Sequence, residues 1–333
     1  MTGIKSITSA IVLFSVTLAA PAADSGGIVA EGAAFEELWN EGSFTEGVAV
    51  DGEGDIYFSD ISMDDSPGKI YRLDAETDKI SVFCADSGKS NGLMFTRDGR
   101  LIAACGANYG RQALCEVTAD GKLKPLAERF EGKRFNAPND LAIHPSGTIY
   151  FSDPRYLGPE PVEIDHMSVY RYDPADDSVV RVTTDISKPN GVIFSPDART
   201  LYVAETDNRT YDVSQPAPDD AQVRMTLNTF PVREDGSLGD KRVLVDFGQK
   251  LGIDGMTVDT EGRIYAAVRS ADRFGIVVFD SDGRELAYLP TPELPTNCCF
   301  GRGQQASTLY ITAGTGLYRI GLRVTGHHSA TAD

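Results

Sequence analysis

A sequence pattern that recurs about every 45 residues constrains the fold of this chain more than any other feature. Each copy has an apolar segment, a short turn containing Gly or Asp, and a second apolar segment in which Tyr is common. The copies begin at residues 47, 92, 140, 191, 255 and 297, so the intervals are 45, 48, 51, 64 and 42 residues. A period of this length with the composition of β-strands is typical of the blades of a β-propeller.

Further short runs of β-branched and aromatic residues follow most copies and indicate two more strands per blade. Examples are found at 69–74, 79–83, 168–173 and 179–182. The last copy is followed by one such run, at 316–320, whereas another, Phe35–Trp39, precedes the first copy. We therefore predict an all-β fold, a six-bladed β-propeller over residues 33–322, in which an N-terminal strand completes the last blade and closes the ring.

The first 22 residues differ from the rest of the chain. Lys5 precedes an uncharged, largely apolar run at 7–20, and Ala20-Pro21-Ala22 follows as an A-x-A site. This arrangement predicts a secretory signal peptide that is cleaved near Ala22 or Ala23. A membrane anchor is the alternative, but the run is shorter than the roughly 20 residues that a spanning helix needs. We expect a secreted protein, periplasmic or extracellular, that does not associate with a membrane, and a disordered tail at 326–333.

The acidic composition disfavours some classes of partner. The net charge of −18 repels nucleic-acid backbones and anionic lipids, and it attracts divalent cations. We expect a monomer that acts on a small molecule.

The cysteine content leaves disulfide pairing open. The five cysteines are Cys84, Cys105, Cys115, Cys298 and Cys299. An odd number leaves at least one thiol unpaired in a monomer, and no C-x-x-C motif occurs. Cys105 and Cys115 flank an expected hairpin, but spacing alone does not establish the geometry of a bridge.

The residues just before the copies form a set of oxygen-bearing side chains. They are Glu46, Asn91, Asn139, Asn190, Asp254 and Thr296. Since the first strand of a propeller blade lines the central channel, these positions should meet around the axis at one end. Two carboxylates and several amides suit Ca²⁺, which takes about six to eight oxygen ligands.

A simpler interpretation is that these residues belong to turns. Asn-Gly and Asp-Gly are common turn dipeptides, and they would explain Asn91, Asn190 and Asp254 without any function. They do not explain Glu46, which is neither Asn nor Asp, or Asn139, which is followed by Asp140 and not by glycine.

The loops after the second strands should rim the same end of the channel, because the first two strands of a blade are antiparallel. These loops contain Asp60, Asp153, Arg155, Tyr156, Asp165, His166 and Asp207. We expect the long loops 154–167 and 206–222 to form a pocket wall or a lid. His166 is the only histidine expected on this rim, which disfavours a transition metal held by histidines.

Several motifs resemble the SMP-30/gluconolactonase/luciferin-regenerating-enzyme-like family over roughly residues 33–322. They are Thr45-Glu-Gly-Val48, Lys133-Arg-Phe-Asn-Ala-Pro-Asn-Asp140, Lys188-Pro-Asn-Gly191, Gly252-Ile-Asp-Gly-Met256 and Thr296-Asn-Cys-Cys-Phe-Gly301. The resemblance implies one divalent ion in the channel, usually Ca²⁺, with Zn²⁺ or Mg²⁺ as alternatives. The ligands that it implies are Glu46, Asn139, Asn190 and Asp254.

The resemblance also implies that the substrate is a sugar lactone. It places Arg134 and Asn136 in a segment associated with substrate recognition, and we add Asn91, Tyr156 and His166 as expected substrate contacts. Two departures from the family pattern lie on the rim. This chain has Asp153-Pro-Arg-Tyr-Leu-Gly158 where many relatives have Asp-Pro-Pro-Tyr-Gly, and it has His166 where an aromatic residue often stands.

The expected reaction is the hydrolysis of an aldonolactone, in which a metal ion polarises the carbonyl group and a water molecule attacks it. Asp254 is the expected general base, although a metal-bound carboxylate is a weak base. His166 or Asp207 could serve instead. The alternatives are an organophosphate or aryl-ester hydrolase with the same site and a non-catalytic, calcium-stabilised binding propeller.

Overall fold

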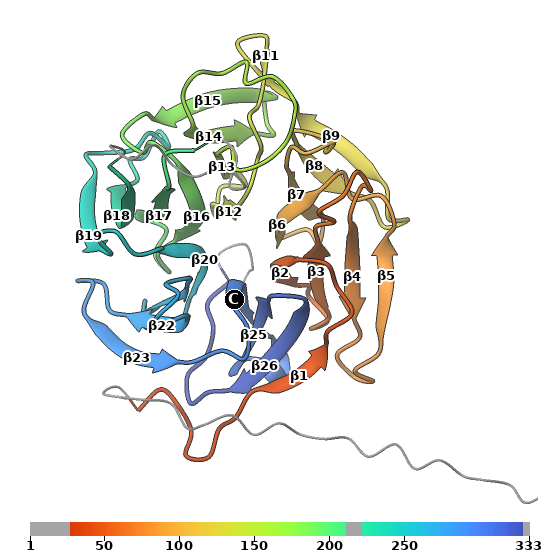
Figure 1. Cartoon of the computed structure of the whole chain (residues 1–333), viewed down its shortest axis with the longest axis vertical. Helices are drawn as coiled ribbons and strands as arrows, with labels where there is room; N and C mark the ends of the chain where they lie inside the picture. Colours follow the sequence, from red (N-terminus) through yellow and green to blue (C-terminus); the bar gives the residue numbers. More distant parts are fainter. Residues whose placement is uncertain (1–26, 211–221, 329–333) are drawn as a thin grey trace, which may run out of the picture.

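The computed structural model describes residues 27–210 and 222–328, and it confirms the predicted six-bladed β-propeller (Figure 1). Six four-stranded antiparallel sheets surround a central channel, and the described residues contain no α-helix. No helix in this part of the chain is long and apolar enough to cross a membrane. The predicted signal peptide lies outside the described residues.

The strands of blades 1 to 5 are hydrogen-bonded in chain order, from the inner strand at the channel outward. Blade 1 comprises β2 (Thr45–Val50), β3 (Ile56–Asp60), β4 (Lys69–Leu73) and β5 (Ile80–Cys84). Blade 2 comprises β6 (Ser90–Phe95), β7 (Leu101–Cys105), β8 (Ala113–Val117) and β9 (Leu123–Ala127), and is followed by a small hairpin of β10 (Arg129–Phe130) and β11 (Lys133–Arg134). Blade 3 comprises β12 (Leu141–Ile143), β13 (Ile149–Asp153), β14 (Ser168–Asp173) and β15 (Ser178–Thr183). Blade 4 comprises β16 (Pro189–Phe194), β17 (Thr200–Asp207), β18 (Arg224–Pro231) and β19 (Arg242–Asp246). Blade 5 comprises β20 (Ile253–Val258), β21 (Ile264–Val268), β22 (Gly275–Phe279) and β23 (Glu285–Leu289).

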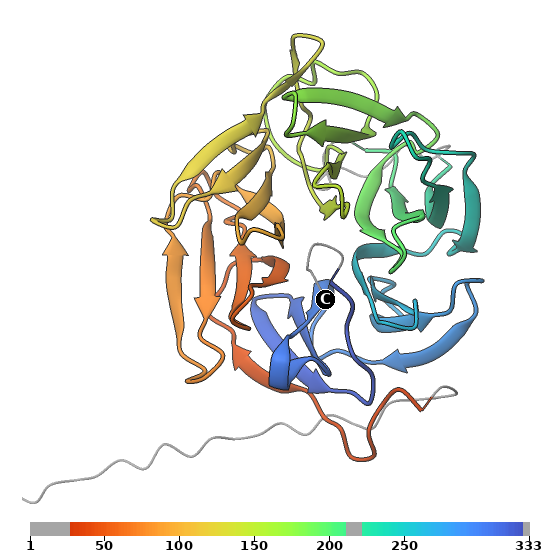
Figure 2. The ribbon, with the colours of Figure 1, turned by 180° about the vertical axis from the view of Figure 1, so that it is seen from behind.

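Blade 6 combines the two ends of the propeller. Its strand order is β24 (Pro295–Phe300), β25 (Thr308–Ala313), β26 (Gly316–Gly321) and, outermost, β1 (Glu36–Trp39). The pairing of β1 with β26 is antiparallel, and Arg319 on β26 forms an ion pair with Glu36 at 2.8 Å. Seen from behind, β1 lies along the outside of the blade (Figure 2). The N-terminal strand β1 is thus the fourth strand of the C-terminal blade, and it links the two ends of the propeller.

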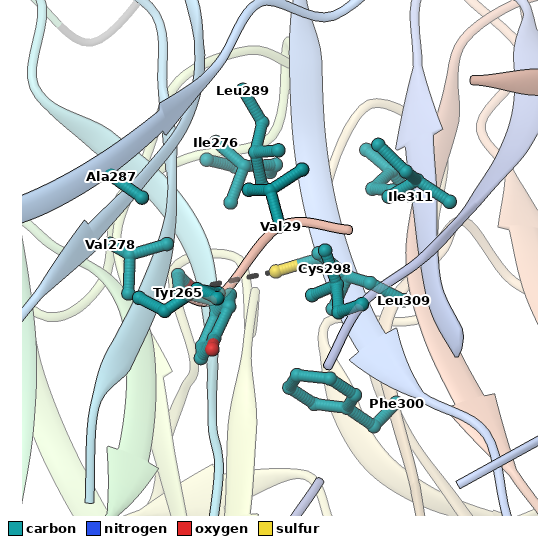
Figure 3. Close-up of a cluster of buried hydrophobic side chains, with 14 of the residues drawn as sticks. Val29, Tyr265, Ile276, Val278, Ala287, Leu289, Cys298, Phe300, Leu309 and Ile311 are labelled. Carbon is teal, nitrogen blue, oxygen red and sulfur yellow. Dashed lines mark hydrogen bonds between the residues drawn. The ribbon is translucent and has the colours of Figure 1, made fainter. Parts of the chain in front are cut away.

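Apolar clusters between neighbouring blades make up the core. Figure 3 shows one of them, between blades 5 and 6, in which Ile276 and Val278 face Leu309 and Ile311. Val29, from the segment before β1, packs in the same cluster. All five cysteines are free thiols in the structure, and four of them are buried.

Glycines allow the inner strands to approach one another at the channel. Gly47, Gly92, Gly191 and Gly255 each follow an oxygen-bearing residue and lie inside β2, β6, β16 and β20. A Cβ atom on Gly47 would lie 2.0 Å from the backbone oxygen of Asn91, far closer than atoms can approach. The simpler interpretation, that Asn-Gly and Asp-Gly form turns here, is therefore wrong. These dipeptides are strand residues that must pack against a neighbouring strand.

The expected disordered tail begins with residues that the structure does describe. Gly326 and His327 donate backbone hydrogen bonds to Ala306 and Val258 at 3.0 Å each. His327 and His328 also line a small cavity of about 60 Å³ at the end of the channel where the inner strands finish. Residues 329–333 lie outside the described part of the chain, and disorder there stays a prediction.

Candidate functional site

A cavity of about 500 Å³ opens at the end of the channel where the inner strands begin. Five of the six oxygen-bearing residues line it, which are Glu46, Asn91, Asn139, Asn190 and Asp254. Thr296 does not, because its buried hydroxyl donates a hydrogen bond to the backbone oxygen of Thr45 at 2.8 Å. The repeat and the antiparallel topology thus bring together the residues that sequence reasoning selected.

Two side chains fill the channel beside these residues. In blade 3 Asp140 stands where blades 1, 2, 4 and 5 have glycine, and its carboxylate accepts hydrogen bonds from the backbone N–H groups of Leu141 and Val192 at 2.9 and 3.0 Å. In blade 6 Asn297 stands there, and its Oδ1 accepts from Cys298 N at 2.8 Å. Both side chains occupy space that glycine leaves open, opposite Gly92 and Gly255 respectively.

The two carboxylates of the cavity are unequally compensated. Arg269 forms an ion pair with Oδ2 of Asp254, and these side chains are 21% and 8% exposed. Glu46 is 3% exposed, and its carboxylate accepts a weak hydrogen bond from Gly47 N at 3.2 Å. Burial, together with the nearby Asp254, raises the pKa of Glu46 well above its usual range. In the described part of the chain Asp254 therefore has a direct cationic partner, whereas Glu46 forms no ion pair.

Sequence reasoning missed Arg269, although the topology could have identified it. The residue directly follows β21, the second strand of blade 5, and the loops after second strands rim this end of the channel. Its guanidinium group also lies over the ring of Phe44, 5.6 Å from the ring centre.

The donor set fits a divalent cation. The described residues contain no cluster of three or more His, Cys, Asp or Glu side chains that could hold a metal ion. The set expected here has only two acids, Glu46 and Asp254, and it is completed by amides of Asn139 and Asn190. Hard oxygen donors with two negative charges suit Ca²⁺ or Mg²⁺, and a buried, poorly compensated carboxylate gains from such an ion.

The other expected substrate contacts are divided between the cavity and its surroundings. Asn91 and Tyr156 line the cavity, and the Tyr156 hydroxyl donates to the backbone oxygen of Thr206 at 3.3 Å. Burial and the nearby Asp254 raise the pKa of Tyr156, so its hydroxyl stays protonated.

Three expected substrate contacts do not line the cavity. Arg134 is exposed on β11. Asn136 is fully buried beneath the rim, where its backbone N–H donates to Asp153 at 2.9 Å. His166 is half-buried, and its Nδ1 lies 2.9 Å from the hydroxyl of Ser168.

The alternative general bases also lie away from the cavity lining. Asp207 accepts a hydrogen bond from the hydroxyl of Ser187 at 2.6 Å, and neither it nor His166 is among the lining residues. Asp254 and Glu46 are the carboxylates that line the cavity in the described part of the chain.

The chain is similar in sequence and in structure to known lactone hydrolases. Residues 44–315 match the sequence profile of the SMP-30/gluconolactonase/LRE-like region. A gluconolactonase of Zymomonas mobilis is 28% identical over 283 residues, which cover 79% of this chain and 75% of the relative. A pentonolactonase of Haloferax volcanii is 28% identical over 272 residues, which cover 80% of this chain and 82% of the relative. The solved structure of a gluconolactonase from Xanthomonas campestris is 28% identical, with a TM-score of 0.77 over 92% of this chain and 96% of the other.

Proposed function

This chain belongs to the SMP-30/gluconolactonase/LRE-like family, and from that membership we propose that it is a lactonase of the gluconolactonase type. The observation that carries the proposal is the arrangement of Glu46, Asn139, Asn190 and Asp254 around one cavity at the channel end. The gluconolactonase and pentonolactonase relatives are equally similar to it, so identity alone does not select the sugar.

The proposed cofactor is one divalent cation, with Ca²⁺ the first candidate. Glu46, Asn139, Asn190 and Asp254 would hold it, since their side chains line the cavity and include its two carboxylates. When bound, the cation supplies positive charge that offsets the charge developing on the lactone carbonyl oxygen.

Side chains of the protein are proposed to orient the attacking water molecule, to accept its proton and to contact the substrate. Oδ2 of Asp254 is held by Arg269, so Oδ1 is the atom proposed to orient a water molecule and to accept its proton. The guanidinium group and the cation make Asp254 a weak base. A lactone is a reactive ester that needs only modest help. The protonated hydroxyl of Tyr156 is proposed to contact a polar group of the substrate.

Proton release from a panel of aldonolactones tests this function. The protein without its first 22 residues is assayed by pH-stat with added Ca²⁺, after chelation, and after Ca²⁺ is restored. The proposal predicts turnover that chelation abolishes and Ca²⁺ recovers. Calcium binding without turnover of any lactone would contradict it and would favour a non-catalytic binding propeller or a hydrolase of aryl esters or organophosphates.

Export is part of the proposal. It rests on the first 22 residues of the sequence, with their positive, apolar and A-x-A segments. A periplasmic or extracellular location would also give the protein access to Ca²⁺.

A further inference from the structure

The wall of the cavity differs in character from its floor. The oxygen-bearing residues form the floor, whereas five large apolar side chains line the cavity beyond it, which are Phe44, Ile61, Met63, Leu157 and Leu251. They belong to loops between blades or between second and third strands. Met63 and Leu251 are also 54% and 43% exposed, so the apolar lining extends to the mouth.

Exposed apolar residues are concentrated at this end of the channel. Seven large apolar side chains are exposed in the described part of the chain. Four of them, Met63, Tyr109, Val162 and Leu251, lie on loops at this end of the channel, and the other three lie on the outermost strands β5, β15 and β19. Met63 and Leu251 also line the cavity, and exposed apolar side chains gathered at a pocket mark a binding surface.

Several polar groups on the wall are already engaged by the protein. The ammonium group of Lys89 donates to the backbone oxygens of Ser62 and Asp64. The hydroxyl of Thr206 donates to the Ile253 oxygen at 2.7 Å, and Oδ1 of Asn208 accepts from Lys188 at 2.6 Å. These groups offer little to a sugar lactone that carries several hydroxyls.

A fully hydroxylated lactone is therefore a poor match for the upper cavity. Its ring and carbonyl can meet the polar floor, but hydroxyls against Leu157 or Leu251 would lose water without gaining partners. An apolar substituent at the same position gains from leaving water.

We propose that the physiological substrate is an amphiphilic lactone, with its ring at the polar floor and an alkyl or aryl substituent against the apolar wall. This inference rests on the proposed lactonase function and concerns the substrate class of the same site.

The test compares glucono-δ-lactone with a series of δ-lactones that bear alkyl chains of increasing length on the ring carbon next to oxygen. We expect kcat/KM to rise about fourfold for each added methylene until the chain passes the mouth. A flat series in which glucono-δ-lactone exceeds every alkyl lactone would overturn the proposal.

Variants of the wall locate the effect. Leu251→Ser and Met63→Ser are each expected to lower the ratio of alkyl-lactone to glucono-lactone kcat/KM about fivefold. Val180→Ser is the matched control, because Val180 is 43% exposed on the outermost strand β15 and does not line the cavity. Equal effects of all three variants would contradict a role for the wall.

A binding measurement separates this inference from the proposed activity. Alkyl-substituted δ-lactams have the same ring and chain and are not hydrolysed, and their affinity is measured by titration calorimetry. If no lactone of either class is hydrolysed, the proposed lactonase function is wrong. Lactam affinity that rises with chain length still supports the apolar wall as a ligand surface, and affinity independent of chain length overturns it.

Discussion

Arg269 is predicted to compete with the divalent cation for Asp254. The substitution Arg269→Met keeps most of the side-chain volume and removes the charge, leaving Glu46 and Asp254 in one cavity without a neighbouring guanidinium group. Breaking a fully buried ion pair from one side costs about 3–5 kcal/mol, and an exposed pair contributes about 0–1 kcal/mol. Since the two side chains are 21% and 8% exposed, we expect the calcium-free variant to lose about 2–3 kcal/mol.

Calcium should reverse the loss. The same substitution removes a positive charge that contacts a ligand carboxylate, so Ca²⁺ is expected to bind about tenfold more tightly. Because an ion that binds only the folded state stabilises it, the gain in Tm on adding Ca²⁺ should be larger for the variant than for the parent protein.

The assay is differential scanning calorimetry with and without Ca²⁺, together with titration calorimetry of the ion. A loss of this size corresponds to a fall in Tm of roughly 5 °C for a domain this large. Arg273→Met is the matched control, because its ion pair with Glu285 joins side chains that are 46% and 37% exposed. Equal stability losses in the two variants, or weaker Ca²⁺ binding by Arg269→Met, would refute the reasoning.

Two further predictions concern the stability of the fold. Gly47→Ala should lower the free energy of unfolding by more than about 3 kcal/mol in denaturant titrations, because its Cβ would lie 2.0 Å from the Asn91 oxygen. Gly52→Ala, where no atom lies within 4 Å of the new Cβ, should be nearly neutral, and similar losses in both would contradict the packing argument. Burial lowers the pKa of His328 from 6.5 to about 4, so between these pH values the unfolded chain binds more protons than the folded chain. Stability should therefore fall as the pH drops through this window, by about 1–2 kcal/mol after allowance for the partial exposure of the ring. In His328→Gln the difference in unfolding free energy between pH 7 and pH 4.5 should shrink by this amount, and an unchanged difference would disprove it.

The fold and the floor of the cavity could be predicted because both follow from the repeat. Periodicity sets six blades, and antiparallel topology then places Glu46, Asn139 and Asp254 at one end of the channel. These positions depend on hydrogen bonds between neighbouring strands, which local sequence patterns encode well.

The rim could not be predicted in the same way, since its loops take their shape from contacts distant in sequence. Arg134 is fixed by a hydrogen bond from its backbone N–H to Glu163 at 2.9 Å, which leaves its side chain exposed. Asn136 is drawn into the interior by the buried carboxylate of Asp153. Neither contact produces a periodic pattern in the sequence from which it could be predicted.

The sequence alone also did not show that the residues after the cavity floor must be glycine. Gly92 and Gly191 follow asparagine and resemble turn residues in the sequence, and only the approach of the next blade shows that a side chain cannot fit. Arg269 was overlooked because a single arginine after a strand has no distinctive local pattern.

Parallel measurement of lactone hydrolysis and Ca²⁺ binding in Asp254→Asn and Asp207→Asn tests the proposed site most directly. Both aspartates are buried, at 6% and 5% exposure, but only Asp254 lines the cavity. The proposed site predicts that Asp254→Asn abolishes calcium-dependent turnover and weakens Ca²⁺ binding, whereas Asp207→Asn retains both. Undiminished turnover in folded Asp254→Asn, or equal losses in the two variants, would contradict it.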